Sequence, residues 1–139
     1  MPKADHIPDS FRDFFTRPVL AHLATLMPDG TPQVTPVWID YDGEHLLINT
    51  IGDRQKGRNL RARARVGLDM VDPDNPFRYL SVRGRVVELT GEGAAAQIDR
   101  LALRYLGTPY PRHDPARPRL LVRIQPEEVI YQERIGEIR

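Results

Sequence analysis

The sequence predicts a mainly β fold, in which about six antiparallel strands close into a barrel flanked by two to three helices. Three observations support this: short strand-like runs dominate the chain, turn signals join neighbouring runs, and 139 residues suit one domain. Closure is favoured because it removes exposed strand edges. We therefore expect a single domain over 1–139, with an N-terminal helix within 1–17 and the barrel over 18–132.

The first half of the chain begins with a short helix and continues with strands. The helix can be capped by Asp9 or Ser10 and carries phenylalanines at helical spacing, namely Phe11, Phe14 and Phe15. Strands are expected at 19–27, 33–41 and 44–50. The turn at Gly30 and the Asp42-Gly43 pair join them as hairpins. Pro36 predicts a bulge or a locally unpaired edge.

The second half alternates helices with long strands. Helices are expected at 54–64 and 94–106, and strands at 66–71, 77–89, 120–125 and 128–132. The alternation of the long strand slips near Val86-Val87, which indicates a bulge. A loop rich in proline and arginine occupies 108–118.

The composition excludes several kinds of site. The chain has no cysteine, which excludes disulfides, thiolate metal sites and cysteine nucleophiles. The histidines show no ligand spacing, so we expect no metal site; they are His6, His22, His45 and His113. No apolar run approaches the roughly 20 residues that span a bilayer, and the start of the chain lacks the apolar core of a signal peptide. We expect a cytoplasmic protein that binds no membrane.

Positive charge is concentrated in one segment. Residues 54–65 contain six cations and no acid, namely Arg54, Lys56, Arg58, Arg61, Arg63 and Arg65. The whole chain has 20 cations and 19 acids, so without these six the balance is 14 against 19, or −5. Such focused charge suits a compact anionic ligand, although a solvated helix face is the alternative. Lys56 shares a helical stripe with Leu60, which places it against the body of the protein near a helix N-terminus, where phosphate binds readily.

Three motifs, in this order, resemble the pyridoxamine 5′-phosphate oxidase-like split barrels. They are ATL-x-x-DG at 24–30, PQ-x-x-PVW at 32–38 and R-x-K-x-RNL at 54–60, and the resemblance covers roughly residues 10–132. The chain is most similar to the branch that includes F420-dependent reductases. The resemblance implies a six-stranded antiparallel split β-barrel of the FMN-binding type.

The resemblance also implies a cofactor site shared between two subunits. The cofactor phosphate would be held by Arg54, Lys56 and Arg58, whereas Asn59 caps or packs. The ring would lie against Thr35, Pro36, Val37, Trp38, Thr50 and Ile51. The partner subunit of a homodimer would close the site, with Phe77 and Tyr79 near the dimer axis. No catalytic side chain is assigned, because the cofactor performs the hydride chemistry.

The sequence favours coenzyme F420 over FMN. The oligoglutamate tail of F420 would welcome additional cations, which could be Arg61, Arg65, Arg112, Arg117 and Arg119. The expected function is hydride transfer between reduced F420 and an electron-poor organic acceptor. The alternatives are an FMN-dependent oxidase or reductase and a non-catalytic flavin- or deazaflavin-binding protein. A nucleic-acid module is disfavoured by the −5 balance outside 54–65 and by the lack of an RNA-binding aromatic motif.

Overall fold

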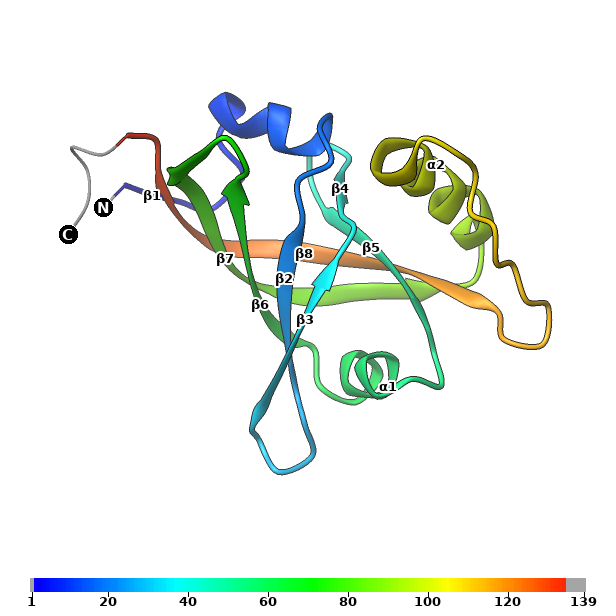
Figure 1. Cartoon of the computed structure of the whole chain (residues 1–139). Coiled ribbons are helices and arrows are strands. Elements are labelled where there is room, and N and C mark those ends of the chain that lie inside the picture. Colours follow the sequence, from blue (N-terminus) through cyan, green and yellow to red (C-terminus); the bar gives the residue numbers. More distant parts are fainter. Residues whose placement is uncertain (1, 135–139) are drawn as a thin grey trace.

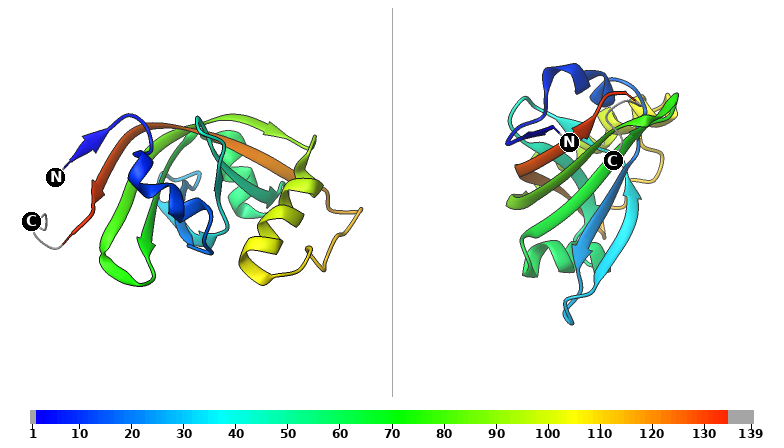
Figure 2. Two further views of the ribbon diagram at one scale, coloured as in Figure 1. Left: turned by 90° about the horizontal axis from the view of Figure 1, so that it is seen from above. Right: turned by 90° about the vertical axis from the view of Figure 1, so that its left-hand side faces the viewer.

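The computed structural model of the chain describes residues 2–134, and its main feature is a curled antiparallel sheet of eight strands (Figures 1 and 2). The elements in chain order are β1 (Lys3–Ala4), the 3-10 helix η1 (Asp9–Phe15), β2 (Ala21–Leu26), β3 (Pro32–Val37), β4 (Asp40–Tyr41), β5 (Leu46–Ile51), α1 (Gln55–Ala62), β6 (Arg65–Asp72), β7 (Asn75–Thr90), α2 (Ala94–Leu106) and β8 (Arg119–Gln132). Neither α1 nor α2 is long and apolar enough to span a membrane, and the described part of the chain has no other α-helix.

The two edge strands of the sheet are consecutive in the sequence. The strand order is β3-β2-β6-β7-β8-β5-β4, with β1 added on β8. Only Trp38 and Ile39 separate β3 from β4, so the chain itself connects the two edges and curls the sheet into a half-barrel. The predicted mainly β split barrel is confirmed, with helices flanking it.

Several predicted strand boundaries were wrong. The run 33–41 forms two strands, because the chain turns from one edge of the sheet to the other at Trp38. Residues 120–125 and 128–132 belong to one strand, β8, which continues through Pro126. Opposite Pro126 lies Gly84, where the register of β7 shifts. A side chain at Gly84 would place its Cβ 2.6 Å from the Gln125 carbonyl oxygen, so this close crossing requires glycine. With β1, which the sequence did not reveal, the sheet has eight strands instead of six.

Two local predictions on the strands are confirmed. The register between β7 and β8 shifts again between Val86 and Glu88, where the sequence indicated a bulge. Pro36 lies on the edge strand β3, where a missing N–H costs no ladder hydrogen bond.

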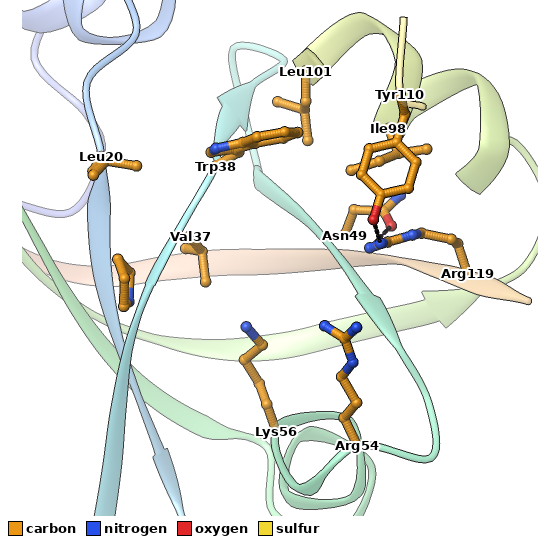
Figure 3. Close-up of a pocket in the computed structure, with 11 residues that line it drawn as sticks. Leu20, Val37, Trp38, Asn49, Arg54, Lys56, Ile98, Leu101, Tyr110 and Arg119 are labelled. Carbon is orange, nitrogen blue, oxygen red and sulfur yellow. Dashed lines mark hydrogen bonds between the residues drawn. The ribbon is translucent and has the colours of Figure 1, made fainter. Parts of the chain in front are cut away.

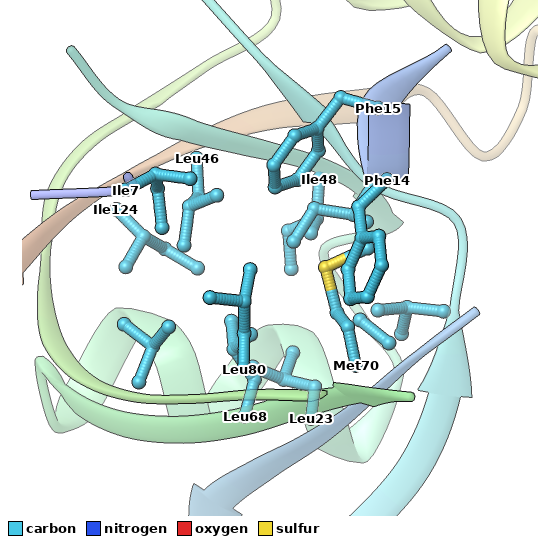
Figure 4. Packing of buried hydrophobic residues seen from close by; sticks show 14 of the residues in the cluster. Ile7, Phe14, Phe15, Leu23, Leu46, Ile48, Leu68, Met70, Leu80 and Ile124 are labelled. Atoms are coloured by element: carbon cyan, nitrogen blue, oxygen red, sulfur yellow. The ribbon is translucent and has the colours of Figure 1, made fainter. Parts of the chain in front are cut away.

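The hydrophobic core fills the interior of the curled sheet and is covered by η1 (Figure 4). Phe11 and Phe14 are fully buried and meet edge to face, with ring centroids 5.1 Å apart. Strand residues from around the sheet complete the core, among them Leu23, Ile48, Met70, Leu80 and Ile124. The predicted phenylalanine cluster therefore forms, although the segment is a 3-10 helix instead of an α-helix.

Helix α1 lies on the other side of the strands from η1 in Figure 1 and contacts them closely. Leu60 enters the core, as its position in the sequence predicted. Asn59 is fully buried and donates a hydrogen bond to the Thr25 hydroxyl at 3.0 Å, so it packs the helix against β2. Gly57 faces the end of β5, where an added Cβ would lie 2.6 Å from the Ile51 carbonyl oxygen. These contacts fix the position of the N-terminus of α1.

Candidate active site

A cavity of about 310 Å³ lies between the β3–β4 crossover, the start of α1 and helix α2 (Figure 3). Its lining residues come from separate parts of the chain and are Leu20, Pro36, Val37, Trp38, Asn49, Arg54, Lys56, Ile98, Leu101, Tyr110 and Arg119. In Figure 3 Lys56 and Arg54 reach into it from α1, and Trp38 lies on the opposite side. The cavity therefore has a cationic end and an aromatic end.

The cationic end consists of Lys56, Arg54 and Arg119. The ammonium of Lys56 lies 3.4 Å from the Thr35 hydroxyl. Burial lowers the pKa of Lys56, and the neighbouring charges of Arg54 and Arg119 lower it further. Within residues 2–134 no carboxylate forms an ion pair with any of the three; Asp53, next to Arg54, pairs with Arg117 at 3.0 Å and interacts with Arg54 only through its charge. The like charges of Lys56, Arg54 and Arg119 repel one another, so an anion bound among them would relieve that repulsion.

The backbone at the start of α1 adds to this positive field. Arg54 is the N-cap residue and has an extended backbone, and no side chain caps the helix. The first N–H groups of a helix lack intrahelical partners, and the helix dipole places positive charge there. The cationic end can therefore offer both side-chain charge and backbone donors to a phosphate group.

The aromatic end is a fixed wall. Trp38 stacks on Tyr105 with ring centroids 5.4 Å apart and an interplanar angle of 9°. The Tyr105 hydroxyl donates to the Val19 carbonyl at 2.5 Å and accepts from the Ile39 N–H at 3.2 Å. Burial raises the pKa of Tyr105, which keeps this hydroxyl protonated and able to donate. Helix α2 thus holds the Trp38 ring in place for contact with a flat apolar ligand.

Arg119 is held by two hydrogen bonds at the side of the cavity. Its guanidinium donates to Asn49 Oδ1 at 3.2 Å and to the Tyr110 hydroxyl at 2.6 Å. Asn49 in turn donates to Ala94 O and Gln97 Oε1, both at 2.8 Å. The amide of Asn49 therefore links Arg119 to α2.

The structure brings together part of the predicted residue set. Arg54, Lys56, Pro36, Val37 and Trp38 line the cavity. Thr35 does not line it but contacts Lys56.

Thr50 and Ile51 do not line this cavity. Asn49 does, and because successive strand residues point to opposite faces, the buried Thr50 side chain points the other way. Ile51 and Arg58 line a second cavity instead. Arg58 donates to Gln55 Oε1 at 2.6 Å and to the Asp53 carbonyl.

Phe77 and Tyr79 lie on β7, outside the cavity formed by one chain. The neighbouring Leu80 is buried in the core, so the alternating Phe77 and Tyr79 face outward. Phe77 is 40% exposed. This outward placement is compatible with their expected position at a subunit interface.

The second cavity has a volume of about 500 Å³ and lies beside α1 and the end of the 108–118 loop. It is lined by Ile51, Gly52, Asp53, Arg58, Arg61, Ala116, Arg117, Pro118 and Leu120. Arg119 lines the first cavity, whereas its neighbour Leu120 and its cross-strand partner Ile51 line the second, so the two cavities are neighbours at the start of β8, beside the turn at Asp53 and Arg54. Of the five arginines proposed for a cofactor tail, Arg61 and Arg117 are here, Arg119 is in the first cavity, and Arg65 and Arg112 line neither.

Sequence reasoning missed several residues of the first cavity: Leu20, Asn49, Ile98, Leu101 and Tyr110. Strand alternation could have identified Asn49, because it is the polar residue between Leu47 and Ile51 on one face of β5. Nothing local identifies Tyr110, which reaches the cavity through the path of the 108–118 loop. Within residues 2–134 no three His, Asp or Glu side chains gather closely enough to hold a metal ion.

The family model for pyridoxamine 5′-phosphate oxidase matches residues 7–133. The chain belongs to this family. The match confirms the resemblance indicated by the three sequence motifs and places the chain among flavin-binding oxidoreductases.

Solved structures of the pyridoxamine 5′-phosphate oxidase fold agree with this assignment. An F420 reductase is 37% identical, with 89% of this chain and 98% of that chain covered and a TM-score of 0.78. A conserved hypothetical protein from Mycobacterium tuberculosis is 26% identical over 94% of this chain and 88% of that one, with a TM-score of 0.70. HupZ of group A Streptococcus shares the fold at 20% identity, with 90% of this chain and 93% of that chain covered and a TM-score of 0.66. The comparison with curated proteins found no significant match.

Proposed function

We propose that this chain is an oxidoreductase that transfers a hydride between reduced coenzyme F420 and an electron-poor organic acceptor. The observation that carries the proposal is the cavity with two unlike ends. Lys56, Arg54 and Arg119 form a cationic end in which no described carboxylate makes an ion pair, and Trp38 stacked on Tyr105 forms a rigid aromatic wall. A phosphorylated tricyclic cofactor likewise has an anionic phosphate at one end and a flat ring at the other.

The residues present fit such a cofactor. Lys56, Arg54 and the start of α1 would hold the phosphate, and Arg119 would approach it from β8. Pro36, Val37 and Trp38 would lie along the ring and keep water from one of its sides. When bound, the cofactor supplies the hydride chemistry, so the protein needs to bind, orient and shield.

The second cavity favours F420 over FMN. Beyond its phosphate F420 carries a lactyl group and an oligoglutamate tail, whereas FMN ends at the phosphate. Arg58, Arg61 and Arg117 line the second cavity with one acid, Asp53, which pairs with Arg117 at 3.0 Å. A tail that leaves the phosphate at Arg54 would pass around the turn at Asp53 toward these cations. The 37% identity to an F420 reductase supports the same choice.

We also propose that the enzyme is a homodimer with two shared sites. A cavity of about 310 Å³ is at the small end of ligand pockets, so one chain covers only part of a tricyclic cofactor. Phe77 and Tyr79 face outward from the long strand β7 and are suited to a twofold interface. We place the enzyme in the cytoplasm, because a chain without cysteine needs no oxidising compartment.

An activity assay tests this proposal. Purified protein is mixed with pre-reduced F420 and a panel of quinone and nitroaromatic acceptors, and reoxidation is followed by absorbance. We expect turnover with at least one acceptor and its loss in Lys56→Ala. Turnover with FMN and not with F420 would favour the FMN-dependent alternative. Tight cofactor binding without turnover on any acceptor would favour a non-catalytic binding protein.

A further inference from the structure

The segment 107–118 passes beside the first cavity on its way from α2 to β8, and one of its residues lines that cavity. This residue is Tyr110, whose hydroxyl points toward Arg119 in Figure 3. Four prolines stiffen the segment: Pro109, Pro111, Pro115 and Pro118. A stiff segment can hold Tyr110 in one place only if it is tied to the body of the protein.

Asp99 on α2 provides this tie. Its Oδ1 atom accepts a hydrogen bond from the Tyr110 backbone N–H at 2.9 Å and lies 2.9 Å from His113 Nε2. The hydrogen bond with His113, together with that from the Tyr110 backbone, lowers the pKa of Asp99. His113 also packs edge to face on Tyr110, with ring centroids 5.5 Å apart. One carboxylate oxygen thus fixes the segment at two points on either side of Pro111.

Tyr110 in turn connects both ends of the cavity. Its ring meets the edge of Trp38 with centroids 6.4 Å apart, and the guanidinium carbon of Arg119 lies 4.6 Å from its ring centroid. Its hydroxyl accepts the hydrogen bond from Arg119 at 2.6 Å. Because Asn49 takes a second Arg119 donor, the guanidinium has a defined orientation with donors left for a ligand.

We propose that Tyr110 is the positioning residue of this site: it covers the Trp38 side of the cavity and orients Arg119 toward the anionic group of the ligand, with Asp99 holding it in place. The role of Arg119 rests on the proposed cofactor site, whereas the covering of Trp38 by Tyr110 does not. Tyr110 acts through Arg119 and Trp38, so the two parts of its role can be separated by variants that keep or remove the ring.

The cover is tested without any cofactor, because Trp38 is the single tryptophan of the chain. Acrylamide quenching of its fluorescence measures access to the aromatic end. We expect Trp38 to be quenched more strongly in Tyr110→Ala and in Asp99→Ala than in the wild type. Tyr110→Phe keeps the ring, and Asp99→Asn keeps an acceptor oxygen, so both should be quenched like the wild type. Asp114→Asn removes the same charge within the segment and serves as control. Unchanged quenching in Tyr110→Ala would show that Tyr110 does not cover Trp38.

The orientation of Arg119 is tested by titrating F420 and FMN into the same variants. Tyr110→Phe removes only the acceptor for Arg119, so we expect about tenfold weaker binding of the cofactor, the effect of one hydrogen bond to a charged group. Wild-type affinity in Tyr110→Phe would overturn this role. If the wild-type chain binds neither cofactor, the proposed function and the Arg119 role both fail, while quenching still decides whether Tyr110 is a cover.

Discussion

The Lys56 ammonium lies 3.4 Å from the Thr35 hydroxyl, and the charges that act on it are those of Arg54 and Arg119. Lys56 is half-buried, and a lysine in that position with a hydroxyl and two cations as neighbours is destabilised in its charged form. Such an arrangement contributes little to folding and is typical of a site prepared for an anion.

Lys56→Ala should weaken cofactor binding by on the order of 1.5–3 kcal/mol, the value of a charge-assisted contact. Equilibrium titration followed by ring fluorescence measures the change. The matched control is Lys3→Ala, which removes the other lysine of the chain, on β1. Wild-type affinity in Lys56→Ala would remove Lys56 from the site.

Cofactor affinity should fall at alkaline pH, starting below the ordinary lysine pKa of about 10.4. The charged ammonium binds the phosphate, and because the pKa of Lys56 is lowered, its charge is lost earlier as pH rises. Titrations between about pH 7 and about pH 10 measure this decline. Lys56→Arg keeps its charge throughout and should give a flatter profile. Identical profiles for the two proteins would show that Lys56 does not control binding.

The linked effect on stability has the opposite direction. The unfolded chain binds more protons at Lys56 than the folded chain between the lowered pKa and about 10.4, so this residue makes the ligand-free protein more stable as pH rises through that window. In urea unfolding, the free energy of unfolding of the wild type should therefore rise with pH through this window. Lys56→Met has no charge to lose there, so the two proteins should differ most in unfolding free energy below the window.

Gly57→Ala should destabilise the protein by roughly 1–3 kcal/mol, because its Cβ would lie 2.6 Å from the Ile51 carbonyl oxygen and 2.8 Å from the Gly52 Cα. The start of α1 would move away from β5, so cofactor binding should weaken as well. Gly67→Ala is the matched control, since its nearest contact would be an ordinary 3.8 Å to the Val82 carbonyl oxygen. Denaturant unfolding of both variants gives the comparison, and equal stabilities would contradict the close packing of α1.

Asp72 should govern acid stability. The hydrogen bond from Arg17 lowers the pKa of Asp72 most, and the Asp74 N–H and Arg78 lower it further. Its contribution to stability is therefore complete above the unfolded pKa of about 3.9 and is lost as pH falls from there toward the lower folded pKa. Asp72→Asn should cost about 1–3 kcal/mol at pH 7 and flatten the acid limb of the stability profile.

The control for Asp72→Asn is Asp74→Asn, which also removes the negative charge of a carboxylate that pairs with Arg17. Asp74 also pairs with Arg17, at 3.0 Å, but its side chain is 87% exposed, whereas that of Asp72 is 9% exposed. Solvent screening should limit the effect of Asp74→Asn to about 0.5 kcal/mol. Similar losses in both variants would show that burial of Asp72 is not what matters.

Phe77→Ala should weaken dimer formation and cofactor binding together, because the ring lies on the outward face of β7, where we expect the partner. Sedimentation velocity and cofactor titration measure the two effects. Leu106→Ala removes a comparably exposed apolar side chain, 54% exposed, from α2 and should change neither. A stable dimer with normal binding in Phe77→Ala would contradict the shared site.

Much of the fold could be predicted from the sequence, because it depends on local signals. The glycine turns, the helical spacing of Leu60 and the slip near Val86 were sufficient to predict the hairpins, helix α1 and the bulge. The division of 33–41 at Trp38 was missed, since an unbroken β-favouring run does not show that the chain changes from one edge of the sheet to the other. The continuity of β8 through Pro126 depends on Gly84 across the sheet, which is a long-range relationship.

The candidate site was predictable where it follows the α1 motif and not where it depends on distant segments. Lys56 and Arg54 were identified because the charge and helical spacing of 54–65 are visible in the sequence. Tyr110 and Ile98 reach the cavity only through the packing of α2 and the following loop. No periodicity in the sequence records that packing.

Equilibrium binding of F420 and of FMN to the purified protein, followed by ring fluorescence or absorbance, tests the cofactor assignment most directly. We expect F420 to bind at least about tenfold more tightly than FMN, a difference of about 1.4 kcal/mol. Tighter binding of FMN would contradict the assignment of the arginine-lined second cavity to a cofactor tail. Failure of both to bind would contradict the cofactor site itself and leave Lys56, Arg54 and Arg119 without the proposed role.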